Sequence, residues 1–270
     1  MFAIRSRLRI AGAVLSAVGC SAVFAAPAIA AETPRSLYDG AAVMFEQVYL
    51  VKPRENTNLG LAYVLAPLII QEGSSDSLVS SRVYFEQSQV PLNGRTHDQI
   101  VYWWFCGTKK SNAVQGVRIT LNTNGAPAIY ESIAPVGSLN QIFVTQPVET
   151  AAQTEYGAAL PGRRHAVERS LTNAPRVVVS RVIDEPAVVM GPIVYLEAGT
   201  HDVATLICRC MDSQAKSVAG QGFYELVPAD FSGKVPAATR PEAAVPHGLP
   251  KDFLNQTNRL SRSLRLPAGF

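Results

Sequence analysis

The sequence predicts an α+β protein that is mainly β. We expect an antiparallel sheet, or two packed sheets, of about eight or nine short strands, with an N-terminal helix and one mid-chain helix. Two observations predict this class: short runs rich in Val, Tyr, Trp and Phe recur along the chain, and residues that favour turns separate them. Hydrophobic residues make up 47% and charged residues 17%, a composition that excludes a disordered chain.

Two helices are predicted. The first has apolar residues at the helical period, and Pro53 ends the pattern. Its apolar positions are Leu37, Ala41, Met44, Phe45 and Val48. The second helix is predicted over Pro147–Tyr156, with proline at its start and Gly157 as its stop.

The strands follow in order, and two of their connections are predicted to be hairpins. Asn122–Gly125 favours a tight turn because Asn and Gly tolerate positive φ, and Ala198–Asp202 predicts a second hairpin turn. Pro127 indicates an edge strand, whereas the apolar run Arg176–Ile183 predicts a strand buried on both faces. The predicted strands are Arg82–Glu86, Gln99–Cys106, Gly116–Leu121, Ala128–Glu131, Gln141–Thr145, Arg176–Ile183, Ile193–Glu197, Val203–Cys210 and Phe223–Val227.

Residues 1–31 have the pattern of a secretory signal peptide. Arginines make residues 1–9 basic, an apolar run starts at Ile10, and Ala28–Ala30 forms an A-x-A cleavage pattern. We therefore expect cleavage between Ala30 and Ala31 and export across the cytoplasmic membrane, to the periplasm or the exterior.

Two alternatives for this segment stay open. Residues 10–31 are long enough to span a bilayer if the signal is retained. Ala17–Cys20 resembles a bacterial lipobox, in which case Cys20 would carry a lipid anchor.

The rest of the chain divides into a body and a tail. Residues 32–230 have the length of a single globular β-rich domain. Residues 231–270 are Pro-rich and basic, and we expect a mobile tail that could contact an acidic surface or lipid head groups. The body is mildly acidic because the arginines and lysines concentrate at the two ends of the chain, which argues against nucleic acid as a partner.

Three cysteines are the first candidates for chemistry. Residues i and i+2 of a strand share a face, so Cys208 and Cys210 are expected to project together. In an oxidising compartment we expect a disulfide from Cys106 to Cys208 or Cys210, or plain packing of these thiols in the core. Two alternatives remain: a zinc site of the three thiolates with His201, and a redox-active C-x-C pair. No cofactor is favoured.

A basic loop is the second candidate. It contains Arg163, Arg164, His165 and Arg169. Arginine forks bind carboxylates and phosphates in a bidentate manner, so this loop is a candidate anion-binding site. The alternative is an ordinary solvated loop.

The sequence contains no established catalytic motif. The G-x-S-x-G nucleophile elbow and the zinc-protease, P-loop and dinucleotide-binding patterns are all missing. We therefore expect an exported, non-catalytic envelope or secreted module that binds a protein, a peptide or a small molecule. The less favoured alternative is a small exported enzyme, or a metal or thiol protein, centred on Cys106, Cys208 and Cys210.

Overall fold

A computed structural model describes ten segments of the chain. They are residues 45–72, 81–106, 113–133, 140–169, 177–185, 188–197, 201–210, 212, 215–229 and 257–270. The chain divides into two units, Met1–Glu32 and Thr33–Phe270, and the described residues belong to the second. The predicted signal peptide, Cys20 and the first part of the predicted N-terminal helix lie outside them.

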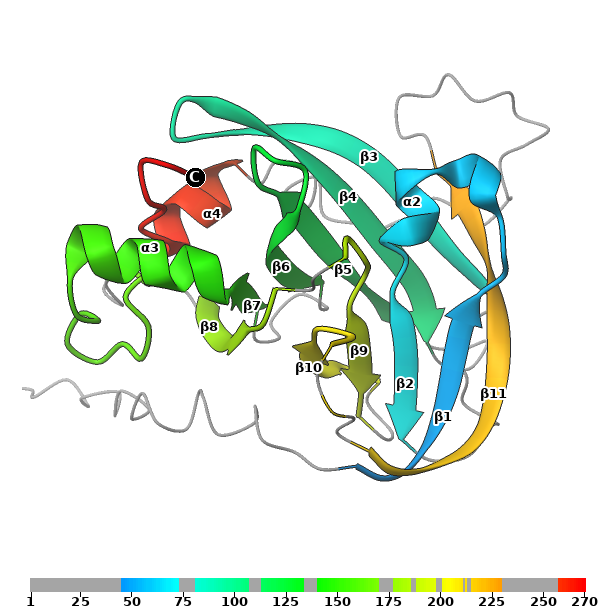
Figure 1. Cartoon of the computed structure of the whole chain (residues 1–270). Helices are drawn as coiled ribbons and strands as arrows, with labels where there is room; N and C mark the ends of the chain where they lie inside the picture. The colour runs from blue at the N-terminus through cyan, green and yellow to red at the C-terminus, as the bar shows by residue number, and fades with distance from the viewer. Residues whose placement is uncertain are drawn as a thin grey trace, which may run out of the picture. The chain divides into compact units, whose positions relative to one another are not determined.

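The described residues form one mixed sheet of eleven strands, in the order β10-β9-β2-β1-β11-β3-β4-β5-β6-β7-β8 (Figure 1). The mainly β class is confirmed, but the expected eight or nine antiparallel strands are wrong. Four neighbouring pairs are parallel: β1 with β11, β11 with β3, β2 with β9, and β7 with β8. The strands are β1 (Phe45–Pro53), β2 (Leu68–Glu72), β3 (Arg82–Leu92), β4 (Arg95–Cys106), β5 (Ala113–Leu121), β6 (Pro127–Ile133), β7 (Asn140–Thr145), β8 (Val177–Ile183), β9 (Ile193–Leu196), β10 (Val203–Ile207) and β11 (Ala215–Pro228).

The predicted N-terminal helix is wrong for its last residues, because Phe45–Pro53 is the strand β1. This strand pairs with β11 on one side and with β2 on the other. Its register shifts between Val48 and Tyr49, so Phe45, Val48 and Val51 are buried at intervals of three residues. A strand with such an irregularity imitates the apolar spacing of a helix.

The sheet is strongly curved, and its concave side holds the largest apolar core (Figure 1). Apolar side chains from both halves of the sheet meet there, together with the short helix α2 (Leu61–Val64), which follows the 3-10 turn Thr57–Leu59. The β9–β10 hairpin is tied to distant strands by two glutamine side chains. Gln115 donates to Asp202 at 2.6 Å, and Gln141 donates to the Val203 carbonyl at 2.7 Å.

A second core lies between the sheet and its helical cover. The helices α3 (Gln146–Tyr156) and α4 (Thr257–Ser263) pack with residues from β3, β6, β7 and β8. The tail that we predicted to be mobile is therefore docked over residues 257–270, since Leu260, Leu264, Leu266 and Phe270 are all buried. The α3 prediction is confirmed, with Gly157 at its C-terminal end.

Both predicted hairpins are present. In the first, Asn122 accepts hydrogen bonds from the backbone N–H groups of Asn124 and Ala126, at 2.9 and 3.0 Å. Pro127 does not mark an edge, however, because β6 lies between β5 and β7. Proline is tolerated there as the first residue of the strand. The run predicted to be buried on both faces is the edge strand β8, and its adjacent residues Val179 and Ser180, which point to opposite faces, are both buried.

The strands β5 and β6, which the Asn122 turn connects, carry a buried ion pair. Arg118 and Glu131 lie directly opposite each other, with Nη1 and Oε2 3.2 Å apart and side-chain exposures of 2% and 1%. Each charge is removed from water, so the two depend on one another for neutralisation.

We expect Gly116→Ala to lower the free energy of unfolding by about 2 kcal/mol, because a Cβ at this position overpacks the sheet. That Cβ would lie 2.2 Å from the carbonyl oxygen of Tyr102, a backbone atom that cannot rotate away. Gly222→Ala is the matched control, since its Cβ would meet nothing within 4 Å. Urea unfolding of both variants measures the difference, and equal stabilities would contradict the close approach.

Candidate functional site

The predicted anion-binding loop is largely used to hold the fold together. Arg163 forms a buried ion pair with Glu168, with 3.4 Å between Nη1 and Oε1. The same carboxylate accepts the backbone N–H groups of Arg164 and His165, at 3.1 and 3.0 Å. Arg169 donates from Nε to the Leu264 carbonyl at 2.7 Å. The basic side chains therefore do not converge on one ligand position.

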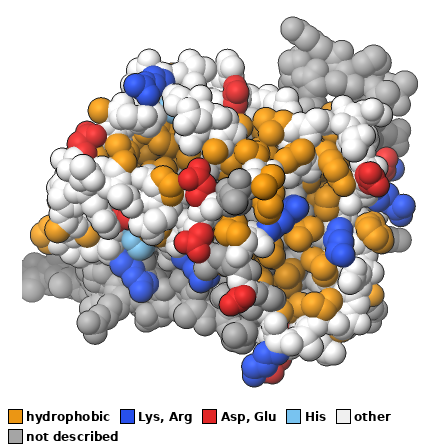
Figure 2. Space-filling model, viewed as in Figure 1, with side chains coloured by type: hydrophobic (Ala, Val, Ile, Leu, Met, Phe, Trp, Pro, Cys, Tyr) orange, Lys and Arg blue, Asp and Glu red, His pale blue; other side chains and the backbone are white. Residues whose placement is uncertain are grey.

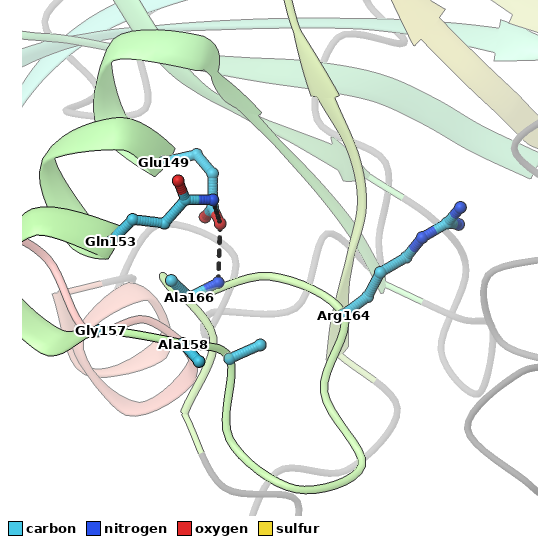
Figure 3. A pocket seen from close by; sticks show the side chains of 7 residues that line it. Glu149, Gln153, Gly157, Ala158, Arg164 and Ala166 are labelled. Atoms are coloured by element: carbon cyan, nitrogen blue, oxygen red, sulfur yellow. Dashed lines mark hydrogen bonds between the residues drawn. The ribbon is translucent and has the colours of Figure 1, made fainter.

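A polar pocket of about 280 Å³ lies between this loop and the end of α3 (Figure 3). Its buried carboxylate, Glu149, is already saturated by the backbone N–H groups of Ala166 and Val167, at 2.8 and 3.1 Å, and by Gln153 at 2.9 Å. Figure 3 shows the Arg164 side chain pointing away from Glu149. The pocket thus has one exposed cation, and its buried acid is already bound within the fold.

The cysteines pair differently from the prediction. Cys208 and Cys210 form a disulfide with each other, at an S–S distance of 2.14 Å, instead of either one bridging to Cys106. The strand β10 ends at Ile207, so the two cysteines lie in the turn after it rather than on one strand face. This bridge takes two of the three thiolates that the alternative zinc site needs. His201 is buried and shares a hydrogen bond with Gln71 at 3.2 Å.

Arg209 is the residue that the disulfide encloses, and its guanidinium points to the concave core. Nη2 donates a hydrogen bond to the carbonyl oxygen of Ala66, just after α2. Burial lowers the pKa of Arg209, and four tyrosines of the surroundings partly offset this effect. These tyrosines are Tyr224, Tyr102, Tyr63 and Tyr130.

Two of the tyrosines are fixed to the same segment as the arginine. Tyr102 donates to the Ala62 carbonyl at 2.8 Å, and Tyr224 donates to the Pro67 carbonyl at 2.7 Å. The α2 segment therefore presents its carbonyl groups to the arginine and to the phenols. Parts of the chain that are distant in sequence converge around Arg209: α2, the disulfide turn and the concave face of the sheet. We call this place the Arg209 site, comprising Arg209, Tyr63, Tyr102, Tyr130 and Tyr224.

The phenols do not neutralise the cation. Burial raises the pKa of Tyr102, Tyr130 and Tyr224 well above the ordinary value, so all three stay protonated at neutral pH. Nε of Arg209 is buried and has no hydrogen-bond partner within the described part of the chain. Within this described part of the chain, no acidic side chain forms an ion pair with Arg209 either. A partly buried guanidinium without a counter-charge is costly, and an anion would relieve that cost.

The environment of the Arg209 site combines this charge with apolar surface. The same short helix that anchors the arginine exposes Leu61 and Val64 to solvent, at 40% and 42%. In the space-filling view hydrophobic side chains gather in the region of α2, β2 and β1 (Figure 2). A guanidinium fork beside apolar side chains and phenol rings suits a small anion that also carries an apolar part.

Sequence reasoning missed this site. The C-x-C pattern directed attention to the two sulfur atoms, whereas the chemistry resides in the residue between them. Tyr102 did stand out as part of an aromatic-rich strand, but nothing in the sequence indicates that it faces Arg209.

Comparison with known proteins gives no further guide. No family model matches the chain, and neither a curated protein nor a solved structure is found to be similar to it. No described helix is both long and apolar enough to cross a membrane. Among the same residues, no three His, Cys, Asp or Glu side chains are grouped as ligands for one metal ion.

We expect Arg209→Met to leave the free energy of unfolding unchanged or to increase it, because the substitution removes a buried charge that has no partner. Arg118→Met is the matched control. It leaves Glu131 buried without its cation and should cost about 3 kcal/mol or more. Thermal and urea unfolding measure both, and a large loss of stability in Arg209→Met would mean that the arginine serves the fold.

The basic loop should make stability depend on pH through His165. Burial lowers the pKa of this histidine, Glu168 and Glu149 raise it in part, and Arg164 lowers it further. The pKa of His165 is therefore lower in the folded chain than in the unfolded chain. The contribution of His165 to stability is complete above about pH 6.5, and it is lost as the pH falls through the folded-state pKa.

We therefore expect the melting temperature to fall more between about pH 7.5 and pH 5 in the native chain than in His165→Gln. His97→Gln provides the control, because it replaces a buried histidine that lies outside this loop. Identical pH profiles for the native chain and His165→Gln would refute the contribution.

Proposed function

We propose that this chain is an exported, non-catalytic module of the cell envelope or exterior, and that it binds a small anion with an apolar part at the Arg209 site. Export rests on the signal-like residues 1–31, and the periplasm or the exterior is the compartment we propose. The binding role rests on one observation above all. A partly buried guanidinium faces protonated phenols and lacks an acid partner among the described residues.

Three further features support a binding role. The disulfide between Cys208 and Cys210 restrains the backbone on either side of Arg209, which reduces the entropy lost when a ligand is bound. The α2 segment holds Arg209, Tyr102 and Tyr224 through three carbonyl groups, so the guanidinium and the two phenol rings are fixed in place before the ligand arrives. Bound anions commonly contact such preoriented forks in two-point geometry.

Binding of benzoate provides the test, because benzoate joins a carboxylate to a flat apolar ring. We expect Arg209→Ala to weaken benzoate binding about 10-fold or more, since hydrogen bonds to charged groups contribute about 1.5–3 kcal/mol. Arg209→Lys should also weaken it, because lysine keeps the charge and loses the planar fork. Isothermal titration calorimetry on the mature chain measures the dissociation constants.

Two controls make the result specific. Arg164→Ala removes an exposed arginine from the α3 pocket and should leave benzoate binding unchanged. Benzamide, the neutral analogue, should bind the native chain much more weakly than benzoate. Equal benzoate affinities of the native chain and Arg209→Ala would refute the proposal, and a loss confined to Arg164→Ala would move the site to the basic loop.

A further inference from the structure

The C-terminal residues 264–270 follow the helix α4 and are bound to the rest of the chain through backbone hydrogen bonds as well as buried side chains. Asn93 donates from its side-chain amide to the carbonyl groups of Leu266 and Pro267, both at 2.9 Å. Tyr156 donates to the Leu266 carbonyl at 2.7 Å. Such contacts recognise a peptide segment through the carbonyl groups that every residue carries.

The contacts continue to the last residues. Arg95 donates to the Gly269 carbonyl at 3.0 Å, and Glu155 accepts the backbone N–H of Ala268 at 2.8 Å. The ring of Phe270 stacks on the buried His97, with centroids 4.6 Å apart and planes inclined by 19°. This aromatic pair anchors the end of the segment, because stacked rings contribute beyond the area they bury.

The start of the segment is held from the basic loop. Arg265 donates from Nε to the Ala166 carbonyl at 2.9 Å and lies over the ring of Tyr156, 5.1 Å from its centroid. A single bridge joins Leu264 to Glu168, outside the eleven-stranded sheet. We name the receiving residues Asn93, Arg95, His97, Tyr156 and Ala166 the tail-binding surface.

The covalent connection between the sheet and the C-terminal segment is a long stretch of sequence. Residues 230–256 separate the end of β11 from α4. At about 3.3 Å per residue when extended, a stretch of this length can reach tens of ångströms. All the contacts between the segment and the tail-binding surface are non-covalent. The same segment of a second copy of the chain would therefore make the same contacts.

We propose that the tail-binding surface is a peptide receptor whose alternative occupant is the C-terminal segment of a second copy of this chain. In the single chain the attached segment competes at an effective concentration of about a millimolar, so the exchange is suppressed at low protein concentration. At high local concentration, two copies exchange their segments and form a symmetric dimer. This inference is independent of the anion binding proposed for Arg209.

The test uses the full chain and a fluorescent peptide of residues 257–270. Phe270→Ala in the chain loosens its own segment while leaving the tail-binding surface intact. We expect the native-sequence peptide to bind this variant at least about 10-fold more tightly than it binds the native chain, because the internal competitor is weakened. Fluorescence anisotropy measures the affinities. The same peptide carrying Phe270→Ala should bind neither chain.

Phe223→Ala is the control, because it removes a phenyl ring that is 55% exposed on β11 and should leave peptide uptake at the native level. If Phe270→Ala does not fold, Arg265→Ala in the chain takes its place, because it removes the contacts of the segment with the Ala166 carbonyl and the Tyr156 ring and leaves the tail-binding surface intact; it should likewise raise uptake of the native-sequence peptide. Sedimentation of the native chain up to about 1 mM should reveal a dimer that Phe270→Ala lacks. A folded Phe270→Ala chain that binds no peptide, or a native chain that stays monomeric throughout, would overturn the proposal.

Discussion

The architecture depends on the pairing of β11 with β1 and β3. Without β11 the sheet would separate into a four-stranded part, from β10 to β1, and a six-stranded part, from β3 to β8. Both of its pairings are parallel, so neither can come from a simple hairpin. Close fit is required along this strand, since a Cβ on Gly220 would lie 2.5 Å from the ring of Tyr49. The concave core and the Arg209 site exist because these two parts are joined.

Turns and helix ends were predictable from the sequence, because they are determined by interactions within a few residues. The Asn122 turn and the helix α3 follow from backbone preferences and capping, and both are present. The β1 strand was not predictable, because a register shift gave its buried residues a helix-like spacing. The parallel pairings and the docking of Phe270 on His97 depend on contacts between residues far apart in the sequence, which no local pattern reports.

The two arginine-containing regions show why charge alone does not identify a site. In the basic loop, Glu168 and Glu149 bind the surrounding backbone, and Arg163 is used to neutralise one of them. In the disulfide turn, Arg209 has carbonyl groups and phenols around it, and no acid of the described residues forms an ion pair with it. The sequence shows the first as a cluster of basic residues and the second as a single arginine between two cysteines. Only the three-dimensional placement of the acids separates a structural cation from one with unused binding capacity.

The parallel pairing of β1 with β11 also has a kinetic consequence. Phe45 lies opposite Ala215, so the central part of the sheet cannot assemble until nearly the whole body of the chain is free to fold. Contacts of such wide separation in sequence slow folding, because the entropy of closing a long loop is lost before the contacts are gained. We therefore expect a chain of this topology to fold more slowly than one built only from neighbouring strands. Translocation systems that thread unfolded chains would therefore have an extended interval in which to engage it.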